Sequence, residues 1–329
     1  MNRPVIAAEK KLTTADGYVL GARIYEPAVP PRAVAVIHGG TAIPQSFYRR
    51  LAAYLAGAGI RVITYDYRGV GASRPRSLRG FSARMQDWAT DADAAMALAK
   101  EGRVPVLWIG HSFGGQLLGL AEQARSAAAA VLIGAQLGYA GHWPARLQPR
   151  IRLFWHLLVP ALTAALGYYP GRAGLGEDLP AGVAQQWRRW ALHPAYYLSE
   201  HPQARERLAR FRQPTLFYSF TDDDLAPEPA VQRLLSLLST GPGAGIIHRR
   251  LTPPELGERE VGHFGAFRAR FEASLWGEIL AFVDHVLEGK RLPASLSAPR
   301  PVPREGFLGT FDAAEGEDIE RFLYLREAR

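Results

Sequence analysis

The 329-residue sequence contains no cysteine, and this absence narrows its chemistry at once. Without cysteine there is no disulfide framework, no thiol nucleophile and no thiolate metal site. A protein without disulfides suits a reducing compartment. The N-terminal residues also lack the charged-then-apolar layout of a signal peptide. We therefore expect a cytoplasmic protein.

The sequence also lacks an uninterrupted apolar run long enough to cross a bilayer. The longest apolar stretch, residues 153–171, is borderline in length and contains His156 and Pro160. We expect a buried or interfacial pair of helices at this position, and no transmembrane helix.

Lysine is scarce, occurring only at positions 10, 11, 100 and 290, so arginine supplies nearly all of the positive charge behind the net charge of +8. Such a balance favours anionic partners or a membrane surface in some proteins. Here the arginines are scattered, and no nucleic-acid-binding motif accompanies them. We therefore predict no nucleic-acid partner, and we favour a small-molecule partner over a membrane surface.

Short apolar runs alternate with helical patterns along most of the chain. Asp16-Gly17 marks a hairpin between two strands. Further strands are expected at residues 32–40, 60–67, 104–112, 128–136, 214–220 and 245–252. Strands that alternate with helices predict an α/β domain built on a mostly parallel sheet with helices on both faces.

The alternation stops between residues 139 and 211, which have helical patterns and many aromatic residues. We predict a core in two parts, residues 1–138 and 212–289, separated by a helical insertion over 139–211 that caps the core. Residues 290–329 are rich in proline, serine and alanine and then become acidic. We expect them to form a loose tail or an arm that packs on a neighbour.

The sequence GHSFG, residues 110–114, follows an apolar strand and precedes a helical pattern. This G-x-S-x-G turn is typical of a nucleophilic serine, because a sharp strand-to-helix turn projects the hydroxyl above the sheet and leaves room only for glycine beside it. The start of the helix presents free N–H groups to developing negative charge. Ser112 is therefore the candidate nucleophile.

A serine hydroxyl needs a general base, and the base needs an acid that orients it. In this arrangement the acid and then the histidine follow the serine along the chain. Asp223 lies directly after the predicted strand 214–220, and Asp222 is the alternative acid. His263, in the loop VGHFG before the last helix, is the only histidine with both the right order and a loop position, so we predict that it is the base.

Acyl transfer also requires N–H donors for the oxyanion. We expect one from Phe113, the residue after the nucleophile, and a second from the loop after strand 32–40. Gly40 is our first choice for the second donor, and Thr41 is the alternative. The predicted reaction needs neither a cofactor nor a metal ion.

Taken together, HGG, TYDYRGVGAS, GHSFGG, FTDDDLAP and GHFG resemble the successive signatures of the α/β-hydrolase superfamily, in the right order between residues 12 and 289. The sequence is most similar to a group of bacterial predicted α/β-hydrolases. The resemblance implies the α/β-hydrolase fold and serine hydrolase activity.

We expect cleavage of a carboxylic ester with an apolar acyl or aryl group, because the insertion is rich in aromatic residues that suit such a substrate. Trp143, Phe154 and Trp155 are the candidate pocket residues. The same triad also serves acyl transfer to another acceptor and cleavage of amides or peptides. A non-catalytic ligand-binding protein is the alternative from a different class.

Overall fold

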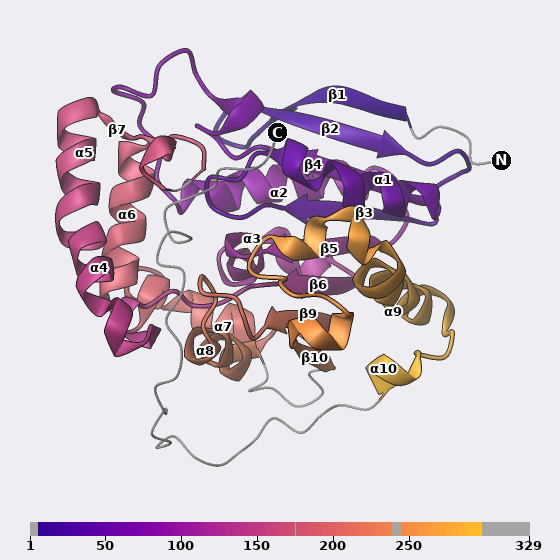
Figure 1. The fold of residues 1–329 in the computed structure, drawn as a ribbon. Coiled ribbons are helices and arrows are strands. Elements are labelled where there is room, and N and C mark those ends of the chain that lie inside the picture. Colours follow the sequence, from indigo (N-terminus) through magenta and orange to yellow (C-terminus); the bar gives the residue numbers. More distant parts are fainter. Residues whose placement is uncertain (1–5, 175, 239–244, 298–329) are drawn as a thin grey trace.

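The computed structural model describes residues 6–174, 176–238 and 245–297 (Figure 1). Its main feature is a sheet of eight strands in the order β1-β2-β4-β3-β5-β6-β9-β10. The first two strands form the antiparallel hairpin predicted at Asp16-Gly17, and β2 is also antiparallel to β4. The remaining pairs are parallel. The strands are β1 Ile6–Thr13, β2 Val19–Glu26, β3 Ala33–His38, β4 Ile60–Tyr65, β5 Val106–His111, β6 Ala129–Ile133, β9 Thr215–Phe220 and β10 Ile246–Leu251.

The central strands are buried on both faces. Every residue of β3, β5, β6 and β9 is buried, which explains why these strands are continuous apolar runs in the sequence. One hydrophobic cluster joins the sheet to α1 Arg49–Gly57 and α9 Gly277–Glu288. The other joins the opposite face to α2 Asp87–Lys100 and α8 Glu228–Leu238. The predicted α/β architecture, with helices on both faces of a mostly parallel sheet, is confirmed.

Between β6 and β9 the chain leaves the sheet. It forms α4 Gln148–Leu153, a π-helical turn at Phe154–Leu158, α5 Val159–Leu166, α6 Ala181–Leu192 and α7 Gln203–Ala209. Figure 1 shows α4, α5 and α6 grouped beside one end of the sheet. A short antiparallel pair, β7 Tyr168–Tyr169 and β8 Leu179–Pro180, lies among these helices and was not predicted from the sequence.

Among the residues that the structure describes, no helix is both long and apolar enough to span a membrane.

The helical pattern that follows the serine turn in the sequence does not form one continuous helix. The structure has only α3 Phe113–Gln116, followed by 3-10 turns at Leu117–Gly119 and Gln123–Ser126. Two glycines within α3 weaken it. At Gly119 the insert packs so closely that an added Cβ would lie 2.8 Å from the Tyr197 hydroxyl. Tertiary packing thus sets the path of this segment.

A buried ion network holds the loop after β4. The Arg68 side chain donates from Nε to Asp91 Oδ1 at 2.8 Å, and its backbone N–H donates to Asp91 Oδ2 at 2.8 Å. The other end of the guanidinium binds Asp16 in the β1–β2 turn. Arg68 therefore ties the hairpin turn, the loop and α2 together, and so braces the loop.

Replacing Arg68 with methionine is expected to lower the free energy of unfolding by about 3–5 kcal/mol, because the Asp91 carboxylate would remain buried without its cation. Urea titration followed by circular dichroism measures the loss. Arg23→Met is the control: Arg23 pairs with Glu9, whose side chain is 85% exposed. Its loss should be below about 1 kcal/mol. Equal losses in the two variants would contradict the bracing role.

Candidate active site

Ser112 lies on a strained turn between β5 and α3. Its φ is +51°, a left-handed value that non-glycine residues rarely adopt. The turn is held by a hydrogen bond from the Ser112 N–H to the Ile133 carbonyl, at 2.9 Å. Close packing explains the flanking glycines, since a Cβ at Gly110 would lie 2.7 Å from the Gly114 backbone and a Cβ at Gly114 would lie 1.9 Å from the His38 carbonyl oxygen. Backbone strain of this kind is often found at functional sites.

His263 is bound to Asp223. The imidazole Nδ1 lies 2.7 Å from Asp223 Oδ2 and 3.0 Å from Asp223 Oδ1. The carboxylate is itself fixed, because Oδ1 accepts the backbone N–H groups of Leu225 and Ala226, each at 2.9 Å. Both side chains are buried. An imidazole held at Nδ1 by a carboxylate keeps Nε2 for proton exchange, as a general base requires.

Asp222 has a different role from Asp223. Its Oδ2 accepts the backbone N–H groups of Val261 at 2.8 Å and Gly262 at 3.0 Å, the two residues that precede His263. Asp222 therefore holds the loop that carries the imidazole. The geometry favours Asp223 over the alternative that the sequence left open.

Ser112, Asp223 and His263 come after the carboxyl ends of β5, β9 and β10, respectively. Gly134, the residue after β6, links them: a Cβ there would lie 3.2 Å from the His263 ring and 3.3 Å from Asp223 Oδ2. The preceding carbonyl, that of Ile133, accepts the Ser112 N–H. The half-buried Ser112 hydroxyl has no hydrogen-bond partner among the described residues. In many hydrolases the contact between serine and histidine tightens only when substrate binds.

The candidate oxyanion donors have different environments. The Phe113 N–H has no acceptor within the described ranges, so it is free to bind an oxyanion. The N–H of Gly40, by contrast, donates to the Tyr48 hydroxyl at 2.8 Å. The expectation for Gly40 is therefore corrected, because its only donor is already used and directed at Tyr48. Thr41, the alternative donor, also has an N–H without an acceptor in the part of the chain that the structure describes.

The aromatic candidates of the insert lie in two places. The Trp143 indole N–H donates to the Asp224 carbonyl at 2.8 Å, directly beside Asp223 in the chain. Phe154 and Trp155 instead contact each other, with ring centres 4.6 Å apart, and pack on Tyr169 and Trp187 respectively. Trp143 thus lies nearer the triad in its contacts, whereas Phe154 and Trp155 contribute to the packing of the insert.

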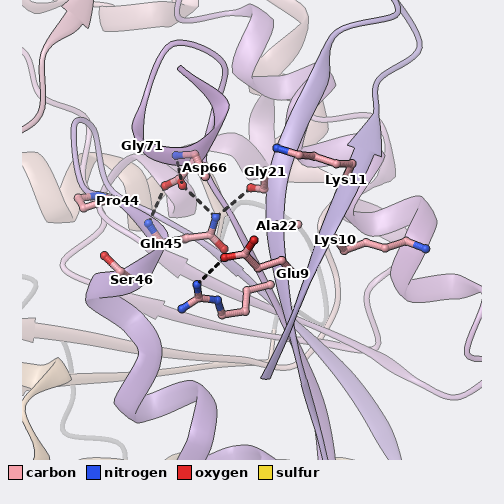
Figure 2. A pocket seen from close by; sticks show the side chains of 12 residues that line it. Glu9, Lys10, Lys11, Gly21, Ala22, Pro44, Gln45, Ser46, Asp66 and Gly71 are labelled. Atoms are coloured by element: carbon pink, nitrogen blue, oxygen red, sulfur yellow. Dashed lines mark hydrogen bonds and ion pairs between the residues drawn. The ribbon is translucent and has the colours of Figure 1, made fainter. Parts of the chain in front are cut away.

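A cavity of about 480 Å³ lies elsewhere, between the β1–β2 hairpin and the loops after β3 and β4 (Figure 2). Gln45 and Asp66 form its polar floor: Asp66 accepts the Gln45 N–H at 2.6 Å and the Gln45 side-chain amide at 2.9 Å. Burial raises the pKa of Asp66 above its usual value. None of Ser112, Asp223 and His263 lines this cavity, and we assign it no part in the reaction.

Two residues of the site escaped sequence reasoning, namely Tyr48 and His111. His111 was recognised only as part of the serine turn, and nothing in the local pattern around Tyr48 indicates a site residue. Both side chains are fully buried, and the Tyr48 hydroxyl oxygen lies within hydrogen-bonding distance of His111 Nδ1, at 2.8 Å.

Within the described residues no group of three His, Asp or Glu side chains could hold a metal ion.

Part of the chain matches a known protein family. Residues 29–185, which include Ser112 but neither Asp223 nor His263, match the family described as Serine aminopeptidase, S33. No curated protein matches the chain.

Solved structures share the fold at low sequence identity. A lipase in an open form has 17% identity and a TM-score of 0.60, over 86% of this chain and 100% of that one. The esterase domain of a Rhodothermus marinus protein has 19% identity and a TM-score of 0.54, over 85% and 98%. Puromycin hydrolase has 19% identity and a TM-score of 0.56, over 88% of this chain but only 40% of its own.

Proposed function

We propose that this protein is a serine hydrolase of the α/β-hydrolase superfamily that cleaves carboxylic esters without a cofactor. The observation that carries the proposal is the short bond between His263 Nδ1 and Asp223, at the same end of the sheet as the strained Ser112 turn. A buried carboxylate–imidazole pair close to a serine hydroxyl is the arrangement that activates the hydroxyl as a nucleophile.

In the proposed reaction the Ser112 oxygen attacks the ester carbonyl carbon while His263 Nε2 takes the hydroxyl proton. Asp223 holds the imidazole in the correct tautomer and stabilises its charged form. The N–H groups of Phe113 and Thr41 stabilise the oxyanion. His263 then returns the proton to the leaving alcohol, and a water molecule cleaves the acyl-enzyme by the same steps in reverse order.

A small apolar ester is the proposed substrate class. The aromatic insert lies beside the end of the sheet that carries Ser112, and Trp143 is bonded next to the triad acid. Aromatic walls suit an apolar acyl or aryl group. Trp143 is the best placed of the three aromatic candidates, and Phe154 and Trp155 support the wall from within the insert.

Amide or peptide cleavage is the second candidate, because the matched family is described as an aminopeptidase. The two activities differ in the leaving group, which is an alcohol for an ester and an amine for an amide. The triad alone serves both reactions, as it serves acyl transfer.

Turnover of matched substrates separates these functions. We expect p-nitrophenyl esters of graded acyl length to be hydrolysed with a kcat/KM at least about 100-fold above that of amino-acid p-nitroanilides, a difference of about 2.7 kcal/mol in transition-state stabilisation. Faster cleavage of the anilides would favour the aminopeptidase. No turnover of either series, together with no labelling by a fluorophosphonate, would favour a ligand-binding protein.

A further inference from the structure

We propose that Tyr48 and His111 are positioning residues, which join the oxyanion loop, the serine turn and the histidine loop through one buried chain of hydrogen bonds. The proposal rests on the proposed serine hydrolase function, and it adds two residues that do not touch the reacting atoms. Each loop in the chain carries a group that the reaction needs.

Three hydrogen bonds make up this connection. The Gly40 N–H donates to the Tyr48 hydroxyl oxygen at 2.8 Å. The Tyr48 oxygen lies 2.8 Å from His111 Nδ1. On the other side of the ring, His111 Nε2 lies 3.1 Å from the backbone carbonyl oxygen of His263. One tyrosine and one histidine thus span from the loop after β3 to the loop before α9.

The direction of each bond follows from its end groups. A backbone N–H can only donate, and a backbone carbonyl can only accept. His111 Nε2 therefore carries the proton that it gives to His263. Burial, with a smaller contribution from the nearby His263, lowers the pKa of His111 well below its usual value, so the ring is neutral and Nδ1 accepts the Tyr48 O–H proton. Each of the three donors in this series of hydrogen bonds therefore has one acceptor.

Packing keeps both residues in place. His111 and Tyr48 are 0% and 1% exposed. Phe267 packs on both rings, with ring centres 4.7 Å from His111 and 5.0 Å from Tyr48. Phe47 and Phe264 complete the surrounding aromatic cluster. Neither polar side chain can reach water, so losing one bond leaves its partner unpaired inside the protein.

The three loops that these hydrogen bonds connect carry the groups that react. His111 directly precedes the nucleophile Ser112 in the sequence. Gly40 directly precedes Thr41, whose N–H is the second proposed oxyanion donor. The carbonyl that accepts from His111 belongs to His263, the proposed base. An added Cβ at Gly40 would lie 3.4 Å from Ser112 Cβ, so the oxyanion loop and the nucleophile are in direct contact. A shift of about 1 Å between such groups can cost about 100-fold in rate. The chain therefore sets the distances between nucleophile, base and oxyanion donor.

Tyr48→Phe tests the proposal, because it removes one oxygen and keeps the ring. We expect kcat for p-nitrophenyl ester hydrolysis to fall about 10- to 100-fold, with KM changed less than about threefold. Tyr218→Phe is the matched control: Tyr218 is also 1% exposed, and its hydroxyl donates to Glu278 at 2.8 Å, away from the triad. Its kcat should stay within about twofold of wild type. Both variants should lose some thermal stability.

A pair of variants at His111 gives a second readout. Leucine removes both ring nitrogens, whereas glutamine keeps one acceptor and one donor. We expect His111→Leu to lower kcat at least as much as Tyr48→Phe, and His111→Gln to recover at least about fivefold of that loss. Equal kcat values for the two His111 variants, or a Tyr48→Phe kcat within twofold of the Tyr218→Phe value, would overturn the positioning role.

Failure of the underlying function gives a different result. If the chain is not a serine hydrolase, wild-type protein shows no ester turnover and no fluorophosphonate adduct. If only the positioning role is wrong, wild type and Tyr48→Phe hydrolyse the ester at similar rates while Ser112→Ala does not. Measuring these variants side by side therefore distinguishes failure of the hydrolase function from failure of the positioning role alone.

Discussion

Ser112→Ala is expected to lower kcat for ester hydrolysis by at least about 10,000-fold, leaving only the catalysis that binding and the oxyanion donors supply. The alanine lacks the oxygen that forms the acyl-enzyme, while the strained turn, the His263–Asp223 pair and the Phe113 N–H remain. Release of p-nitrophenol under saturating ester measures the loss. The methyl side chain is smaller than the hydroxymethyl, so the fold should be retained.

Ser126→Ala is the control for Ser112→Ala, because Ser126 is exposed and its hydroxyl bonds only the nearby Gln123 carbonyl. Its kcat should equal that of wild type. Circular dichroism of all three proteins confirms that each is folded. A folded Ser112→Ala protein that retains more than about a tenth of wild-type kcat would show that the ester is cleaved by other groups.

Asp223→Asn is expected to lower kcat by about 10,000-fold with little change in the fold. The amide cannot stabilise the imidazolium, and its NH2 group opposes a proton on His263 Nδ1, so the ring would turn to the wrong tautomer. Stopped-flow acylation by a p-nitrophenyl ester measures the step in which His263 must accept the proton.

Asp222→Asn is the matched comparison, since the two residues are neighbours and differ only in what they hold. An asparagine at 222 still offers an oxygen to the N–H groups of Val261 and Gly262. We expect its kcat to fall less than about 10-fold. The reverse order, with Asp222→Asn the more damaging change, would make Asp222 the triad acid and contradict the assignment of Asp223.

Much of the fold can be predicted from the sequence, because parallel strands buried on both faces consist of consecutive apolar residues. Strands β3, β5, β6 and β9 lie where those runs occur. The serine turn was predictable for a related reason, since GHSFG combines a strand end, a helix start and glycines whose Cβ atoms would clash. Chain order then pointed to His263 as the candidate base and restricted the acid to two neighbouring aspartates.

The rest depends on contacts between segments that are distant in the sequence. Only the structure shows that Asp223 meets the imidazole while Asp222 holds the loop. The Gly40 expectation failed because Tyr48, in a 3-10 turn eight residues later, takes the N–H that the local pattern left free. The short α3 is a similar case, since Tyr197 of the insert packs on Gly119. The domain boundaries, with an insertion over 139–211 and a tail from 290, remain our proposal, and residues 298–329 lie outside the described part of the chain.

Mass spectrometry of the fluorophosphonate-treated protein tests the account most directly, because the probe reacts with a serine that has a base and an oxyanion site beside it. Digestion should place a single adduct on Ser112 in wild-type protein, and the His263→Ala variant should react at least about 100-fold more slowly. An adduct on another residue, or unmodified Ser112 in folded wild-type protein, would contradict the assignment of Ser112, His263 and Asp223 as a working triad.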